Sequence, residues 1–273
     1  MDLLSQPFDP LGRDWRAALP IPVGALWPFA LLLTVGAGAE ALEVAPRILT
    51  RPLVVAGFHG GLLGGALGAA WGRKQGWQGP SSLLAALLLL AGASYQANPW
   101  GGVAYLLVPL ALVRLGLGAP ELRRIGWTRP EGLCSALLGA ALGLFLGAHL
   151  LFSASRTLGY QMHVSPRDFL AAFAYDMGAN VLSAELCIRG TLFNAWHRRW
   201  GFWPGALLGT GAILFRYLID PSLPRTLEVT AGLFLYLSLL SLGGCALMAR
   251  SGSVLPSLVS SLCFFGAYRT LHL

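Results

Sequence analysis

A glutamate and an arginine stand four residues apart in LSAELCIRGTLF, residues 182–193, a stretch that is otherwise almost wholly apolar. Glu185 and Arg189 therefore fall on one face of a helix, with the acid on the N-terminal side, which is the favourable order for an ion pair. Such a pair could be an acid or base with its orienting cation, or a self-neutralising strut inside a bundle. The spacing alone favours the strut.

Two more charged residues, Asp176 and Arg216, stand in apolar surroundings near this pair. A charged side chain at the centre of a bilayer costs about 2.5 to 3.5 kcal/mol on insertion scales, so all four residues should face the interior and find partners. Asp176 precedes Glu185 by about two and a half helical turns, which points their carboxylates to nearly opposite faces. We therefore expect no carboxylate dyad on this helix.

The histidines and cysteines form no pattern that predicts a metal or a cofactor. His59 and His149 each stand alone in an apolar segment, where packing or an interfacial position is the simpler interpretation. The cysteines have no metal-ligand spacing and are expected to be small buried side chains without disulfides. They are Cys134, Cys187, Cys245 and Cys263.

The composition predicts a polytopic membrane protein. Of the 273 residues, 55% are hydrophobic and only 11% are charged, with a mean hydropathy of +0.64, whereas a soluble domain has roughly 25% charged residues. Nine apolar runs are long enough to cross a bilayer, which takes about 17 to 25 residues. They are residues 22–45, 52–72, 81–97, 101–118, 133–155, 168–197, 202–219, 228–249 and 254–271. The predicted fold is an all-α transmembrane helical bundle of about eight to nine spans.

No part of the chain could fold as a water-soluble domain, so we expect one continuous membrane domain. Residues 1–119 would form an N-terminal tail and the leading helices, and residues 120–273 the core. The first residues lack the features of a signal peptide. A cytoplasmic N-terminus places ten basic residues inside and six outside, in the sense of the positive-inside rule. Because the arginines are scattered through short loops, they predict no nucleic-acid partner.

Glycine recurs at every fourth position in two of the apolar runs, at Gly60, Gly64 and Gly68 and again at Gly139, Gly143 and Gly147. This spacing lets helix backbones approach closely inside a membrane. Packing within one bundle is the favoured interpretation. Binding to another membrane protein is the alternative.

The string AELCIRGTLF, with the later GFWPGALLGTGAILFRYLID and SLLSLGGCALMARSGSVLPSLVSSLCFF, resembles the CAAX-processing and bacteriocin-self-immunity family of intramembrane glutamic proteases. The resemblance covers roughly residues 120–268, and PELRRIGWTRPEG is similar to the loop before the family's core. The family's motifs are Glu-Glu-x-x-x-Arg-Gly, Phe-x-x-x-His, and His-x-x-x-Asn or Asp after a Gly-Ser-x-x-x-Pro turn. Their degenerate positions here are Ala184, Glu185, Arg189, Phe215, Ile219, Ser260 and Phe264.

The resemblance implies a relative of these proteases that lacks most catalytic residues. The glutamate that activates water in the family falls on Ala184, and the two histidines fall on Ile219 and Ser260. Amide hydrolysis needs a base within reach of water and donors for the developing oxyanion, and a carboxylate already paired with an arginine is a poorer base. We therefore expect no catalytic residue, no metal and no cofactor.

The expected function is that of a pseudoprotease, a scaffold or accessory subunit that binds a membrane protein, a lipid or a lipidated chain. Its arginine-, alanine- and leucine-rich composition is typical of a bacterial cytoplasmic (inner) membrane protein from a GC-rich genome. One alternative is a transporter or permease component, in which the four buried charged residues line a path. Another is an active CAAX-type endopeptidase with a relocated site built from Asp176 and His149.

Overall fold

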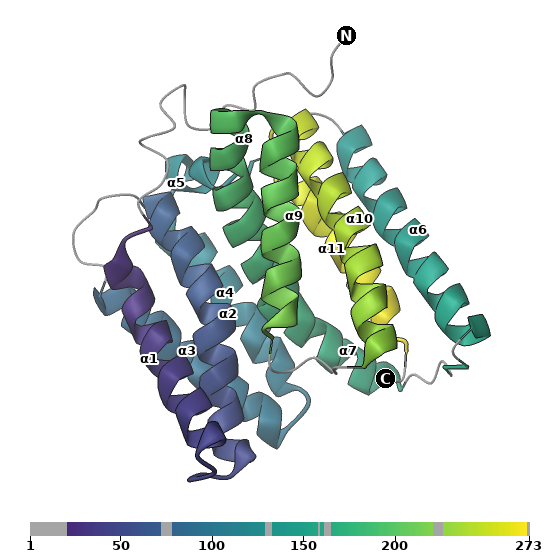
Figure 1. The fold of residues 1–273 in the computed structure, drawn as a ribbon. Coiled ribbons are helices and arrows are strands. Elements are labelled where there is room, and N and C mark those ends of the chain that lie inside the picture. The colour runs from purple at the N-terminus through teal and green to yellow at the C-terminus, as the bar shows by residue number, and fades with distance from the viewer. Residues whose placement is uncertain are drawn as a thin grey trace.

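A computed structural model describes residues 21–71, 78–128, 133–157, 159–160, 165–220 and 226–271, and these ranges are almost entirely helical, without a β-strand (Figure 1). The α-helices are α1 Val23–Ala41, α2 Arg47–Trp71, α3 Gln78–Ala97, α4 Gly101–Gly116, α5 Ala119–Arg124, α6 Leu133–Thr157, α7 Pro166–Asp176, α8 Asn194–Trp200, α9 Phe202–Leu218, α10 Leu227–Ser251 and α11 Leu255–Tyr268. Two π-helical segments, η2 Met177–Leu182 and η3 Glu185–Phe193, lie between α7 and α8. The all-α prediction is confirmed.

Five helices are long and apolar enough to cross a membrane, as expected for an integral membrane protein. They are Val23–Ala41, Arg47–Trp71, Gly79–Ala97, Leu133–Thr157 and Thr230–Ser251. The other predicted spans also coincide with helix over most of their length, but those helices are shorter or less apolar. Helix length and composition therefore support five membrane-spanning helices, fewer than the eight or nine that the sequence predicts.

One long helix, formed by α7, η2, η3 and α8 in direct succession, is the axis of the bundle. It contacts α4 and α2 on one side and α9, α10 and α11 on the other. Figure 1 shows α1 to α4 on one side of the molecule and α6, α10 and α11 on the other, with α9 against the long helix. The leading helices and the core thus pack as one bundle.

The long helix is π-helical around the buried pair of Glu185 and Arg189. The wider turn is visible at Thr191, whose hydroxyl donates to the carbonyl of Leu186, five residues earlier, at 3.1 Å. Only Ser183 and Ala184, between η2 and η3, keep α-helical geometry. Because π-helical turns occur frequently at functional sites, this segment is the natural place to look for one.

The first glycine repeat packs α2 against α1. A Cβ placed on Gly60 would lie 2.6 Å from the ring of Phe29, and one on Gly64 would meet the same ring. A Cβ on Gly68 would lie 2.9 Å from Pro22, just before α1. This face of α2 is covered by the chain's own first helix.

The second repeat packs α6 against α11. A Cβ on Gly139 or Gly143 would meet the backbone carbonyls of Pro256 and Ser260, and one on Gly147 would also meet α11. Both repeats therefore serve packing within one bundle, as favoured above. Binding of another membrane protein at these faces would require α1 or α11 to move aside.

Candidate functional site

The carboxylate of Glu185 lies in the middle of the bundle, buried and surrounded by hydrogen-bond donors. Arg189 donates from Nη1 to Oε1 in an ion pair within η3. Two hydroxyls from α11 complete the shell, Ser261 at 2.6 Å from Oε1 and Ser257 at 2.8 Å from Oε2. These four residues are the Glu185 centre. A carboxylate has about four acceptor positions, and three are used here.

Arg189 is held on its other side by α10. Its Nη2 lies 3.4 Å from the carbonyl oxygen of Leu240, and a Cβ on Gly244 would come within 2.5 Å of Nε. The guanidinium group therefore needs a glycine beneath it. Arg189 is among the largest fully buried side chains of the protein, and its Nε makes no hydrogen bond to any described residue.

The loop after α5 contacts both segments that supply the Glu185 centre, η3 and the start of α11. A Cβ on Gly190, directly after the arginine, would meet the carbonyl oxygen of Ile125, so the loop approaches the helix backbone closely. In the same loop Gly126 accepts a hydrogen bond at 2.8 Å from the backbone N–H of Val254, just before α11. The loop thereby ties η3 and the start of α11 together.

The remaining motif positions lie outside this centre. Ala184 is buried in the core, and Phe264 packs its ring against Tyr236. Ser260 is buried, but its hydroxyl makes no hydrogen bond to the described residues. Phe215 and Ile219 face outward, 64% and 45% exposed. On α11 the side chains that reach Glu185 are Ser257 and Ser261, not the two positions reached by counting from Pro256.

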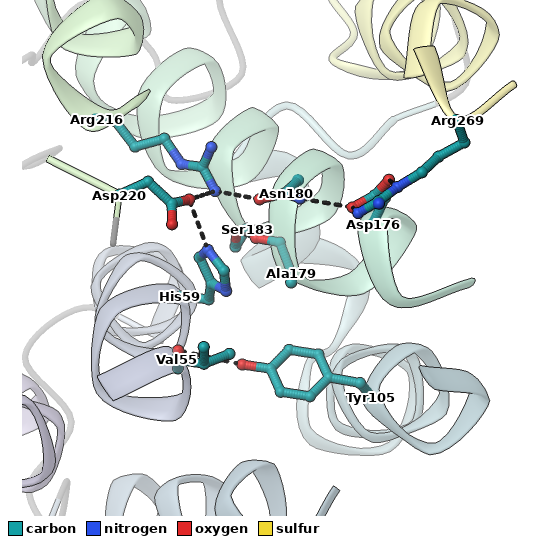
Figure 2. Close-up of polar contacts among 10 residues, drawn as sticks. All are labelled: Val55, His59, Tyr105, Asp176, Ala179, Asn180, Ser183, Arg216, Asp220 and Arg269. Atoms are coloured by element: carbon teal, nitrogen blue, oxygen red, sulfur yellow. Dashed lines mark hydrogen bonds and ion pairs between the residues drawn. The ribbon is translucent and has the colours of Figure 1, made fainter. Parts of the chain in front are cut away.

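A second polar centre lies nearer the end of the bundle where α9 and α11 end (Figure 2). His59 on α2 places Nε2 at 3.3 Å from Oδ2 of Asp220, in the turn after α9. Arg216 on α9 places Nη2 at 3.4 Å from the same oxygen. All three side chains are at most 3% exposed. We call them the Asp220 centre.

A polar connection leads from the Asp220 centre to a second ion pair. Nη2 of Arg216 donates at 2.5 Å to the amide oxygen of Asn180, whose amide nitrogen donates at 2.7 Å to Oδ1 of Asp176. Arg269, just after α11, donates to both carboxylate oxygens of Asp176, with Nη2 at 2.7 Å from Oδ1. Figure 2 shows this continuous line of contacts from α2 to the end of α11.

Aromatic rings surround the Asp220 centre. The guanidinium carbon of Arg216 lies 4.0 Å from the ring centroid of Tyr217 and 5.7 Å from that of Phe58. The imidazole of His59 has its centroid 6.5 Å from that of Tyr105 and 6.3 Å from that of Tyr175. Ring faces attract the arginine charge but accept hydrogen bonds weakly. Accordingly Nε and Nη1 of Arg216 and Nδ1 of His59 have no hydrogen-bond partner among the described residues.

The prediction that the charged residues Asp176, Glu185, Arg189 and Arg216 face the interior agrees with their burial in the structure. The two carboxylates have separate partners, which confirms that they form no dyad. His149 donates to, or accepts from, the hydroxyl of Tyr236 at 2.8 Å. Asp176 instead bonds Asn180 and Arg269, and no hydrogen bond or ion pair within the described ranges joins it to His149.

Sequence reasoning missed several partners in both centres. They are His59 as an ion-pair partner, Asn180, Asp220, Ser257, Ser261 and Arg269. One signal was available: Arg216 and Asp220 repeat the four-residue spacing of Glu185 and Arg189. No group of three metal-ligating side chains occurs in the described ranges.

Comparison of the chain with models of known protein families, with curated proteins and with solved structures yields no match. The likeness to the intramembrane glutamic proteases therefore depends on the motif residues alone.

Proposed function

We propose that this protein is a catalytically inactive relative of the intramembrane glutamic proteases that acts as a scaffold or accessory subunit in a bacterial cytoplasmic membrane. The observation that supports it is the state of Glu185, the acid retained from the family's first motif. Its carboxylate already accepts from Arg189, Ser257 and Ser261. Every neighbour at this centre therefore stabilises the ionised, fixed carboxylate.

Water activation asks for a different arrangement. A general base must reach the proton of the attacking water, and donors must face the developing oxyanion. Ala184 offers neither, and the donors around Glu185 are directed at the carboxylate itself. Protonation of Glu185 would leave Arg189 buried with an unbalanced charge, which costs several kcal/mol. Glu185 therefore suits a structural role better than proton transfer.

The partner we propose is a transmembrane helix, a lipid or a lipidated chain. Both glycine repeats are used inside the bundle, so a partner would have to bind elsewhere. Large apolar side chains remain exposed on α6 and α9, including Phe145, Phe152 and Phe215. Such surfaces face either lipid or another helix in a membrane.

Two measurements test this proposal. Purification from the native membrane in mild detergent should recover a membrane protein or a lipid in stoichiometric amount, whereas a bare bundle would contradict the scaffold role. A prenylated or transmembrane peptide should remain intact during incubation with the purified protein. Cleavage that disappears in Glu185→Gln or Asp176→Asn, with both variants folded, would show an active protease instead.

Transport is the second candidate, and the line of polar contacts in Figure 2 favours it. It brings charged or titratable side chains from α2, α7, α9 and the end of α11 into one connected set, all of them buried except the half-buried Arg269, and such intramembrane charges often mark ion pathways. The test is solute or ion flux in proteoliposomes. Flux that is lost in Asp176→Asn and in Arg216→Gln would favour transport over the scaffold role.

A further inference from the structure

Two cationic or potentially cationic groups contact one oxygen atom in the Asp220 centre. Oδ2 of Asp220 lies 3.3 Å from Nε2 of His59 and 3.4 Å from Nη2 of Arg216. Both distances are longer than an ideal charge-assisted hydrogen bond, which is about 2.7 to 2.9 Å. The carboxylate is thus shared between two donors and optimally placed for neither.

Arg216 has a second acceptor within reach, and His59 does not. The same Nη2 atom lies 2.5 Å from Oδ1 of Asn180, so Arg216 can give up Asp220 and keep a polar partner. Nδ1 of His59 is buried and without a hydrogen-bond partner among the described residues. Asp220 is therefore the carboxylate on which the imidazole depends.

Among the described residues of this network, the charges balance while the imidazole is neutral. Arg216 offsets Asp220, and Arg269 offsets Asp176, so a proton on His59 would add one net positive charge to a buried set of residues. The carboxylate of Asp220, which the imidazole already contacts, is the group best placed to compensate that charge. Neutral histidine and histidinium therefore favour different partners for Asp220.

We propose that His59 and Asp220 form a proton-binding site, in which Arg216 competes with the protonated imidazole for Asp220. On proton uptake, Nε2 of His59 and Oδ2 of Asp220 move closer, and Arg216 gives up its contact with Asp220 while it keeps its hydrogen bond to Asn180. On proton release, Arg216 again neutralises Asp220. The site does not depend on the scaffold role proposed above.

The titratable and charged groups that face His59 come from three other helices. Asp220 and Arg216 belong to α9 and its final turn, and Tyr105 lies on α4. From α7, the ring of Tyr175 faces the imidazole, and Asp176 lies within electrostatic range of it. Acids and bases are thus present together, and only His59 among them has an ordinary titration range near neutral pH.

Proton binding would change the connection between the leading helices and the core. His59 belongs to α2, whereas Asp220 follows α9, and Asn180 lies on the π-helical segment η2. A tighter bond between His59 and Asp220 therefore joins α2 to α9, while the arginine released from Asp220 stays bonded to the long helix through Asn180. The proton would act on the packing of three helices.

The experiment uses a full-length protein in which His59 is the only histidine. His149, His163, His197 and His272 are replaced by Gln, which leaves the proposed site unchanged, and the ring of His59 and the arginine side chains carry ¹⁵N for NMR in detergent micelles. We expect one imidazole titration within the pH range over which the protein stays folded. The Nη resonances of Arg216, assigned with Arg216→Lys, should shift with the same midpoint.

Asp220→Asn is the decisive variant, because it keeps the side chain's shape and removes the charge. Its titration midpoint should fall by about one pH unit or more, since the imidazolium loses its partner. A His59 ring that stays in one protonation state over the whole range would overturn the proposal. Nη resonances of Arg216 that stay constant through the titration of His59 would also overturn it, because the arginine would then not compete for Asp220.

Discussion

The hydroxyl of Ser261 lies 2.6 Å from Oε1 of Glu185, across 76 residues of sequence. This contact joins α11 to the long helix at the buried carboxylate of Glu185. A serine hydroxyl donates a hydrogen bond to a carboxylate, but unlike histidine it does not titrate near neutral pH and so is no general base. The residue that faces Glu185 from α11 therefore fixes the acid in place.

The three serines of α11 provide a matched test of this role. Ser257→Ala and Ser261→Ala should each lower the free energy of unfolding by about 1.5 to 3 kcal/mol, because each removes a hydrogen bond to a buried charge. Ser260→Ala is the control on the same helix, since its hydroxyl has no hydrogen-bond partner among the described residues. Unfolding by a denaturing detergent gives the comparison. Equal losses at all three positions would contradict the role assigned to Ser257 and Ser261.

The ion pair between Glu185 and Arg189 should behave as a buried unit. Glu185→Gln or Arg189→Met alone should cost about 3 to 5 kcal/mol in unfolding free energy, because each leaves the other charge uncompensated. The double variant should cost clearly less than the sum of the two. A double-mutant cycle of unfolding measurements provides the coupling energy. Additive losses would mean that the two residues stabilise the bundle independently.

The sequence was enough to predict the class of fold and four of the ten polar residues that form the two centres and their connection. Apolar runs predict membrane helices because hydrocarbon leaves the backbone few other options. Buried charges such as Arg216 were visible because they interrupt such runs at a large energetic cost. Their own-helix partners follow from spacing, as Glu185 and Arg189 demonstrate.

The partners on other helices could not be predicted from spacing. His59 and Asp220 are 161 residues apart, and only the packing of α2 against the core brings them together. Asn180 and Ser257 carry no charge, so nothing in an apolar run distinguishes them from packing residues. The π-helical turns add a further obstacle, because a pattern with 3.6 residues per turn places side chains on the wrong face after such a segment.

The ion pair between Asp176 and Arg269 predicts a difference between arginine and lysine. Arg269 contacts both oxygens of the buried Asp176, and such two-point contact suits a guanidinium group. Arg269→Gln should cost about 2 to 3 kcal/mol in unfolding free energy, and Arg269→Lys should recover only part of it. Thermal unfolding in detergent is the measurement. Full recovery by lysine would show that charge alone matters there.

Replacing a glycine by alanine should lower the stability of the protein only where another helix lies against that glycine. Gly143→Ala should destabilise the protein by about 1 to 3 kcal/mol, because the new methyl group would meet the backbone of Ser260. Gly211→Ala on α9 is the control, as no heavy atom lies within 4 Å of its ideal Cβ. Alanine should be neutral there, or stabilise the helix by up to about 1 kcal/mol. Similar losses at both positions would contradict the packing of α6 on α11.

The two ends of the described bundle lie at opposite faces, which bears on the number of spans. Pro22, at the start of α1, packs near Gly68 at the end of α2, on the side where Arg124 of α5 bonds the carbonyl of Ala70. The end of α11 lies at the other face, where Arg269 reaches the long helix soon after it begins. Nine spans would place the two chain ends on opposite sides of the membrane, and eight would place them on the same side.

Reporter fusions distinguish these counts. With a cytoplasmic N-terminus, a fluorescent protein fused before Met1 should mature, and alkaline phosphatase fused after Leu273 should be active, because it folds only outside the cytoplasm. A phosphatase fused after Thr128, beyond four predicted spans, is the control and should be inactive. An inactive C-terminal fusion of normal abundance would favour eight spans. An active fusion at Thr128 would instead reverse the orientation, since Arg123 and Arg124 at the end of α5 would then lie outside, against the positive-inside rule.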